Sequence, residues 1–181
     1  MNETLLHDVL TLLARRGTPA ALIGAIALAA HGIARATLDL DLLALDTGLL
    51  STEPWKDLSE AGDTVEVRSG DAEDPLAGVI RLTRSGKTPV DVVVGKHRWM
   101  EGVLTRAGTL SFGERRVPIV DAADLVILKV FAGGPQDLLD AELLLAGERG
   151  EELRVEVETR LPVVPARLRQ SARRLLARRR A

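Results

Sequence analysis

Two aspartates inside an apolar run, Asp39 and Asp41, have a spacing that suits a shared chemical task. They belong to the sequence LDLDLL over residues 38–43. In a strand, alternate side chains point to the same face, so the two carboxylates would stand roughly 7 Å apart on that face. Two unpaired carboxylates on a partly buried face are costly, and the pattern therefore favours a bound hard cation. The alternative interpretation is a half-exposed strand whose polar face meets water.

Gly24 lies just upstream, between the apolar run 20–23 and the small-residue segment 25–31. This pattern predicts a strand followed by a helix. Free backbone N–H groups at the start of a helix favour an anion such as a phosphate. Carboxylates for a metal and a helix start for phosphate together suggest a metal–nucleotide site.

A longer set of residues around this site carries a family resemblance. The set is Gly24, Ala25, His31, Gly32, Arg35, Thr37, Asp39 and Asp41. It resembles the signature of the polymerase-beta-type nucleotidyltransferase superfamily, in which Gly-Gly or Gly-Ser precedes Asp-x-Asp or Asp-x-Glu. It is most similar to the small bacterial branch that includes abortive-infection (AbiEii-like) nucleotidyltransferase toxins. The second Gly or Ser of that pattern is Ala25 here.

The same resemblance implies a third carboxylate from a later strand, and Asp91 fits that role. Asp91 interrupts an apolar run over residues 89–94, where a lone charge is costly without a partner. If residues 79–82 and 89–94 form a hairpin beside the Asp39–Asp41 strand, Asp91 comes within reach of both. The alternative is an edge residue that faces solvent.

A second part of the resemblance lies in residues 124–140. By that resemblance, Lys129 would neutralise triphosphate charge, and Asp137 would orient Lys129 or another catalytic group. The sequence supports Lys129 independently, because it is the only charge between Asp124 and Asp137 and must extend to solvent or meet an anion. A salt bridge to Asp137 or to the aspartate cluster is the competing explanation. The relatives often carry Arg and Lys where this chain has Gly134 and Gln136.

The resemblance implies an α/β (α+β) nucleotidyltransferase fold, with a mixed twisted sheet backed by helices. We expect a catalytic core over residues 1–120 and a small helical part over residues 121–181. The implied enzyme moves a nucleoside monophosphate from a nucleoside triphosphate, such as ATP, to an acceptor hydroxyl.

The roles implied for single residues follow the family pattern. Asp39 and Asp41 would hold two Mg²⁺ or Mn²⁺ ions about 3.5–4 Å apart, and Asp91 would complete the site. Gly24 and Ala25 would offer backbone donors to the phosphates, with help from Arg35.

The acceptor is less constrained by the sequence. An RNA 3′ end, tRNA in particular, is the first expectation, which would make the protein the toxin of a toxin–antitoxin pair with an antitoxin protein as partner. A protein side chain is the second, and a small molecule such as an aminoglycoside is the third, because those relatives commonly carry a larger helical domain. A non-catalytic binding module with this fold is the alternative from another class.

Composition narrows the chemistry further. The chain has 181 residues, no cysteine and three separated histidines, so any metal site must be rich in oxygen. No basic leader precedes an apolar segment, and no apolar run has the length of a membrane span, so we expect a cytoplasmic protein without a membrane partner. The net charge of −2 hides seven arginines in the last sixteen residues. This tail could be solvated, contact RNA phosphates or dock on the acidic body of the chain.

Hydrophobic periodicity and turn residues predict the remaining elements. His31 is interpreted as a capping or partly buried polar residue, with a catalytic role as the alternative, and residues 96–99 are interpreted as either surface loop or substrate contact. The predicted helices cover residues 2–16, 25–31, 54–61, 125–132, 135–146 and 151–161 and the arginine-rich end, and the predicted strands cover residues 20–23, 38–45, 65–68, 79–82, 89–94, 110–112 and 117–120.

Overall fold

A single mixed sheet forms the centre of the molecule. The computed structural model describes residues 3–36, 39–113 and 115–178. The strands are β1 (Ala20–Leu22), β2 (Leu40–Ala44), β3 (Thr64–Ser69), β4 (Leu76–Thr83), β5 (Val90–Gly95), β6 (Gly108–Phe112) and β7 (Arg115–Ile119). They pair in the order β3-β4-β5-β2-β1-β7-β6. The pairs β2–β5 and β1–β7 are parallel and the others antiparallel, so the sheet is mixed as predicted.

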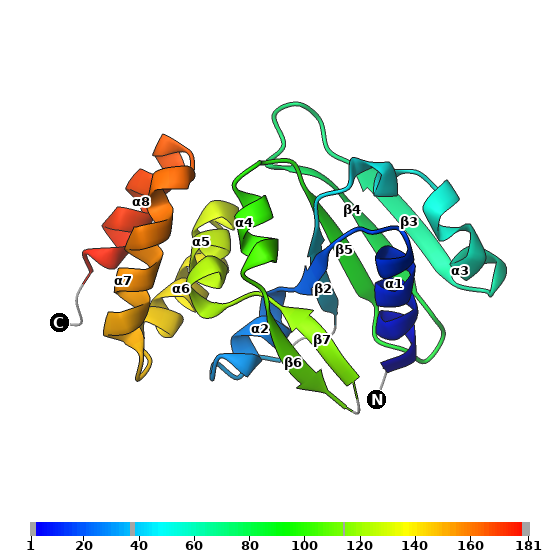
Figure 1. Cartoon of the computed structure of the whole chain (residues 1–181), viewed down its shortest axis with the longest axis horizontal. Helices are drawn as coiled ribbons and strands as arrows, with labels where there is room; N and C mark the ends of the chain where they lie inside the picture. The colour runs from blue at the N-terminus through cyan, green and yellow to red at the C-terminus, as the bar shows by residue number, and fades with distance from the viewer. Residues whose placement is uncertain (1–2, 37–38, 114, 179–181) are drawn as a thin grey trace.

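Helices surround the sheet, and the last four gather at one end of the molecule (Figure 1). The α-helices are α1 (Glu3–Arg15), α2 (Gly24–Ala30), α3 (Lys56–Glu60), α4 (Met100–Thr105), α5 (Ala122–Ala132), α6 (Pro135–Ala146), α7 (Gly150–Arg160) and α8 (Ala166–Leu176), with short 3₁₀ turns at Thr47–Leu50, Glu53–Trp55 and Leu161–Val163. Figure 1 shows α1 and α3 on the side of the molecule away from α7 and α8. Among the described residues, no helix is both long and apolar enough to cross a membrane.

The core explains why these segments adopt their structures. One face of α1 buries its leucines and valine completely, as its helical spacing predicts. Trp55 is fully buried and its indole N–H donates to the Leu49 carbonyl at 2.8 Å, so it anchors the start of α3 to the core. The central strands β2 and β5 each carry one aspartate between two buried apolar residues, so Leu40, Leu42, Val90 and Val92 fill the core while Asp41 and Asp91 share the other face.

Most of the predicted elements are confirmed, including the pairing of β4 with β5 beside β2. Helix α4 was not predicted, because its six residues are too few to show a helical period. Strand β2 begins at Leu40, so Asp39 precedes it. Thr37 and Leu38, which were assigned to the family signature and to this strand, lie outside the described residues.

Asp124 joins the helical part to the segment before it. Its side chain is almost fully buried in α5 and accepts two hydrogen bonds from Arg106, at 2.8 and 2.9 Å, at the end of α4. Arg160 of α7 lies 2.9 Å from the same carboxylate and also pairs with Asp121, the N-cap of α5. One buried carboxylate therefore connects three helices across position 120.

We expect Asp124→Asn to lower the free energy of unfolding by about 2 kcal/mol, because two arginines lose the charge of their shared buried partner. Urea unfolding followed by circular dichroism measures the change. Glu152→Gln is the matched control, since it breaks an exposed pair with Arg149 and should change stability by less than about 0.5 kcal/mol. Equal small losses in both variants would contradict the structural role of Asp124.

Candidate active site

Strand register brings the predicted carboxylates together. Asp41 of β2 and Asp91 of β5 are direct partners in the parallel pair, so their side chains lie next to each other on the same face. Asp39, just before β2, lies close enough to raise the pKa of both. The three aspartates predicted as metal ligands therefore converge at one place, although they come from separate parts of the chain.

Gly24 is required by the close approach of Asp41. A side-chain carbon at position 24 would lie 2.0 Å from Asp41 Oδ2, and the backbone there has φ +64°. The neighbouring Ile23 N–H donates to the Asp41 carbonyl at 2.9 Å. The glycine of the predicted signature thus lets the start of α2 lie directly against the carboxylate, which is a packing reason for glycine in addition to the predicted phosphate contact.

The carboxylates are poorly stabilised as anions. Burial raises the pKa of Asp41 above its ordinary value, and the charges of Asp91 and Asp39 raise it further, against the opposing fields of Lys129 and Arg81. Burial also raises the pKa of Asp91, where Arg81 opposes and Asp39 adds to the shift. Asp91 Oδ1 is buried without a hydrogen-bond partner. An unpartnered oxygen among repelling carboxylates is a site that attracts a cation.

Arg81 on β4 supplies a cation that the sequence reasoning did not identify. Its Nη1 donates to Asp91 Oδ2 at 2.8 Å and its Nη2 to Asp39 Oδ1 at 3.1 Å. Arg81 is the register partner of Asp91 in the antiparallel pair β4–β5, so Arg81, Asp91 and Asp41 form one row across the sheet. The signal was present in the sequence, because the predicted hairpin places Arg81 opposite Asp91.

The donor set suits magnesium or manganese. Carboxylate oxygens from Asp39, Asp41 and Asp91 are the hard ligands that these ions prefer. Asp91 Oδ1 has no hydrogen-bond partner and is therefore available to coordinate an ion. Among the described residues, no three acidic or histidine side chains are already gathered as a metal-binding group. Arg81 is instead bonded to two of the three aspartates.

A second charged cluster surrounds Lys129 of α5. Lys129 Nζ lies 2.8 Å from Asp137 Oδ1, which confirms the predicted salt bridge, and 2.9 Å from the deeply buried Asp140 Oδ2. Arg35 Nη1 also donates to Asp140, at 2.6 Å, and Gln136 donates to its other oxygen at 3.0 Å. Asp140 is therefore the centre of this cluster, which the sequence reasoning did not recognise.

The two clusters interact electrostatically. Although burial lowers the pKa of Lys129, its hydrogen bonds to Asp137 and Asp140 raise it overall, so the ammonium stays charged. For Asp140, burial raises the pKa, but Lys129, Gln136 and Arg35 together lower it below its ordinary value. Lys129 in turn lowers the pKa of Asp41 through its charge. Lys129 is thus bonded to Asp140 and near enough to the carboxylate site for its charge to act on Asp41.

Other residues singled out in the sequence have structural contacts. His31 Nε2 donates to the Val120 carbonyl at 2.8 Å, consistent with its interpretation as a capping residue. Lys96 donates to two carbonyls of the loop at residues 71–72, while His97 and Trp99 both pack edge-on against Phe131. Neither sequence interpretation, surface loop or substrate contact, included these packing contacts, and Trp99 is buried.

The arginine-rich helix α8 docks on the chain itself. Its apolar residues Leu168, Ala172 and Leu175 are buried. Arg173 pairs with Glu158 of α7 and Arg178 pairs with Glu142 of α6, both at 2.6 Å. Of the three interpretations of this tail, docking on the acidic body therefore has direct support in the structure.

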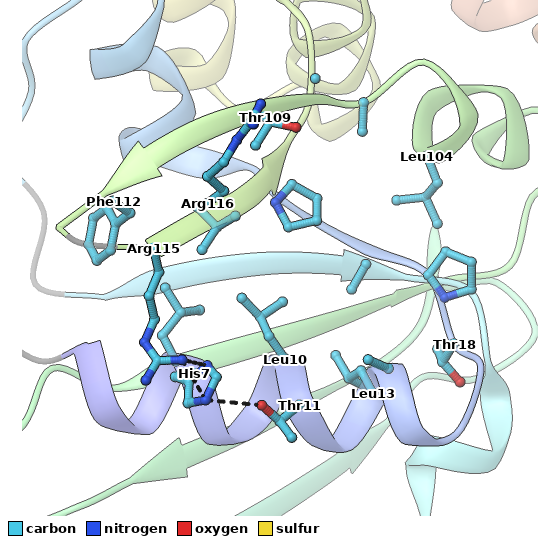
Figure 2. Close-up of a pocket in the computed structure, with 18 of the residues that line it drawn as sticks. His7, Leu10, Thr11, Leu13, Thr18, Leu104, Thr109, Phe112, Arg115 and Arg116 are labelled. Atoms are coloured by element: carbon cyan, nitrogen blue, oxygen red, sulfur yellow. Dashed lines mark hydrogen bonds between the residues drawn. The ribbon is translucent and has the colours of Figure 1, made fainter.

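A cavity of about 800 Å³ lies apart from the carboxylates, between α1 and the β6–β7 hairpin. Figure 2 shows its apolar lining, with Leu10 and Leu13 of α1 facing the hairpin, and Arg115 extending to His7 at one end. Arg115 Nη1 lies 2.7 Å from His7 Nε2. None of the aspartates predicted as metal ligands lines this cavity.

The crowding of the carboxylates makes a prediction about stability and pH. Because the pKa of Asp41 is raised in the folded protein, the native state holds a proton that the unfolded chain has already lost above pH about 3.9. Stability therefore falls as pH rises from that value through the raised pKa. Without metal, we expect Asp41→Asn to unfold about 3 °C higher than the wild type at pH 7.5, with an advantage that disappears towards pH 4. Thermal melts in EDTA across this range measure it, and a constant or absent difference would contradict the raised pKa.

Comparison with known proteins bears on the fold. The sequence matches no protein-family model and no curated protein. The crystal structure of ANT(2'')-Ia in complex with adenylyl-2''-tobramycin is similar with a TM-score of 0.53 and 14% sequence identity, covering 96% of this chain and 98% of that chain. The solution structure of the antibiotic-resistance factor ANT(2'')-Ia gives a TM-score of 0.51 at 16% identity, covering 88% of this chain and 92% of that chain.

A third similar structure is that of an antigenic nucleotidyltransferase-like protein from Paracoccidioides brasiliensis. Its TM-score is 0.50 at 16% identity, and the match covers 97% of this chain and 85% of that chain. At these identities the likeness concerns the fold, and the abortive-infection branch stays a prediction. The chain has the nucleotidyltransferase fold, as its sequence predicted.

Proposed function

We propose that the protein is a metal-dependent nucleotidyltransferase that moves a nucleoside monophosphate from a nucleoside triphosphate to an acceptor hydroxyl. The observation that carries this proposal is the in-register pair Asp41–Asp91, joined by Asp39, on a nucleotidyltransferase fold. Carboxylates are seldom placed side by side in a sheet unless a cation or a proton separates their charges. Their raised pKa values and the unpartnered Asp91 oxygen fit the binding of Mg²⁺ or Mn²⁺.

In the proposed reaction, the acceptor oxygen forms a bond to the α-phosphorus and the bond from that phosphorus to the bridging oxygen of the β-phosphate breaks. Pyrophosphate leaves with the electron pair, and the acceptor proton passes to the Asp91 carboxylate. The raised pKa of Asp91 suits a general base better than an ordinary aspartate would. Bound Mg²⁺ or Mn²⁺ at Asp39, Asp41 and Asp91 supplies charge stabilisation to the attacking and leaving oxygens.

The remaining residues bind and orient the triphosphate. Lys129, whose charge acts on Asp41, offsets phosphate charge, with Asp137 and Asp140 fixing its position. Arg35 is held by Asp140 and adds positive charge beside Lys129. Gly24 and Ala25 present backbone N–H groups at the start of α2, where no side chain caps the helix. ATP is one such triphosphate, and an assay with each labelled nucleotide in turn identifies the one that is used.

An RNA 3′ end, tRNA in particular, is the proposed acceptor, and on that acceptor the protein would act as a toxin that an antitoxin protein neutralises. Two α8 arginines, Arg167 and Arg174, are exposed and can contact RNA phosphates. The pairing of Arg173 and Arg178 with glutamates of the same chain reduces, but does not remove, this positive surface.

A small-molecule hydroxyl is the second candidate acceptor, and one observation favours it. The chain covers 98% of the structure of ANT(2'')-Ia bound to adenylyl-2''-tobramycin, so that protein has no larger helical domain beyond the shared length. The expectation that an aminoglycoside acceptor requires a larger helical part therefore does not exclude it here.

We expect Asp41→Asn, Asp39→Asn and Asp91→Asn each to reduce Mg²⁺-dependent transfer by about 10³-fold, because each removes a ligand of the proposed metal site. The assay incubates the protein with each α-labelled triphosphate, Mg²⁺ and either total RNA, total protein or a panel of aminoglycosides, and measures where the label goes. Asp57→Asn, on the exposed side of α3, is the matched control and should keep full activity. Retained activity in the folded Asp41→Asn protein would refute the metal role, and absence of any nucleotide binding by the wild type would favour a non-catalytic module.

The RNA acceptor makes a separate prediction for α8. We expect Arg167→Glu combined with Arg174→Glu to reduce labelling of RNA several-fold and to lower the salt dependence of RNA binding by about two phosphate contacts. Labelling of a small-molecule acceptor should not change. Lys56→Glu combined with Lys87→Glu reverses two exposed charges elsewhere and is the control. Equal effects of both pairs would contradict a specific role for α8.

A further inference from the structure

The carboxylate site already contains a cation that belongs to the protein. Arg81 bonds Asp91 at 2.8 Å through Nη1 and Asp39 at 3.1 Å through Nη2, so one guanidinium spans two predicted metal ligands. The hydrogen bond to Asp39 and the charge of Asp91 raise the pKa of Arg81, so the guanidinium is a permanent charge there. A divalent ion and this guanidinium would compete for the same carboxylate oxygens.

We propose that Arg81 is an internal counter-ion that occupies the metal ligands when no nucleotide is bound and must move away before the metal site assembles. This inference rests on the proposed function, because it requires Asp39 and Asp91 to be metal ligands. It explains why, among the described residues, the three aspartates do not already form a metal-binding group despite their convergence. It also explains how they remain close together without metal.

The position of Arg81 on the sheet allows such a movement. Its side chain is 36% exposed, whereas that of Asp91 is 15% exposed, so Arg81 can leave towards solvent without opening the core. Glu66 of β3 is its register partner on the other side and adds to the rise in its pKa. The half-exposed Glu66 is therefore an alternative partner for Arg81 within the same row of the sheet.

The consequence is a coupling between metal and nucleotide. In the free protein, the metal must displace the Arg81 guanidinium from Asp39 and Asp91, and this competition weakens metal binding. A triphosphate brings its own negative charge, which offers the released Arg81 a new partner and the metal additional oxygen ligands. Metal should therefore bind weakly to the free protein and much more tightly with nucleotide, and removal of the Arg81 charge should reduce this difference.

The test measures Mn²⁺ binding to the full chain without nucleotide, by the loss of the free-ion signal in electron paramagnetic resonance. We expect Arg81→Gln to bind Mn²⁺ about tenfold more tightly than the wild type, because the competing positive charge is gone. Arg81→Lys keeps the charge but cannot span both carboxylates with two nitrogens, so its affinity should lie between the two. Arg68→Gln removes an arginine of β3 whose charge also acts on Asp91 but whose guanidinium bonds Glu66, and it should change affinity by about twofold at most.

A second measurement shows whether each variant is folded. In EDTA, Arg81→Gln should unfold at a lower temperature than the wild type, because the carboxylates lose their counter-ion, and Mn²⁺ should raise its unfolding temperature more than that of the wild type. Equal Mn²⁺ affinity of the wild type and Arg81→Gln would overturn this inference and leave the proposed function intact. Absence of Mn²⁺ binding in both folded proteins, with and without nucleotide, would overturn the metal role on which both depend.

Discussion

Mutual repulsion between carboxylates is the constraint on which the site depends. Parallel pairing of β2 with β5 fixes Asp41 beside Asp91, and neither can turn to the other face without placing its apolar neighbours in solvent. The hydrophobic core therefore holds the charges together against their electrostatic preference. Burial raises the pKa of both aspartates, and the neighbouring carboxylate charges add to the rise.

The surrounding residues compensate for this repulsion from two sides. Arg81 reaches the site along the sheet from β4, and Lys129 reaches it from α5. Lys129 is itself fixed by Asp140, whose burial would be costly without Lys129 and Arg35. In the free protein, the charges of Arg81 and Lys129 thus offset part of the negative charge of the carboxylates. A metal–nucleotide complex brings both positive and negative charge, so it can exchange partners with these cations and leave few charges unpaired.

The sequence predicted the parts of the fold and site that local patterns determine. The Asp-x-Asp alternation, the single charge in residues 89–94 and the turn between β4 and β5 were enough to predict three converging aspartates. Arg81 was missed although the predicted hairpin places it opposite Asp91, and Asp140 was named with Asp137 but given no role, because its contacts depend on how the helices pack. In the local sequence, Arg81 has the pattern of an ordinary polar residue in an alternating strand. In the local sequence, Asp140 is one of several acidic residues of α6 and nothing marks it as buried, yet its side chain is 1% exposed.

In the described residues, every strand precedes the boundary predicted near residue 120 and only helices follow it, but contacts cross it. His31 bonds to Val120, Arg106 bonds to Asp124, and Arg35 bonds to Asp140. The bonds of Arg106 to Asp124 and of Arg35 to Asp140 join the predicted core to the helical part, and the His31 bond ends at the last residue before it. Lys129 contributes its charge to Asp41 from the helical side of that boundary. Because a carboxylate site of this kind needs cations at fixed positions, the helices that hold Lys129 are part of the site, in addition to the sheet residues Arg81 and Arg68 whose charges act on Asp91.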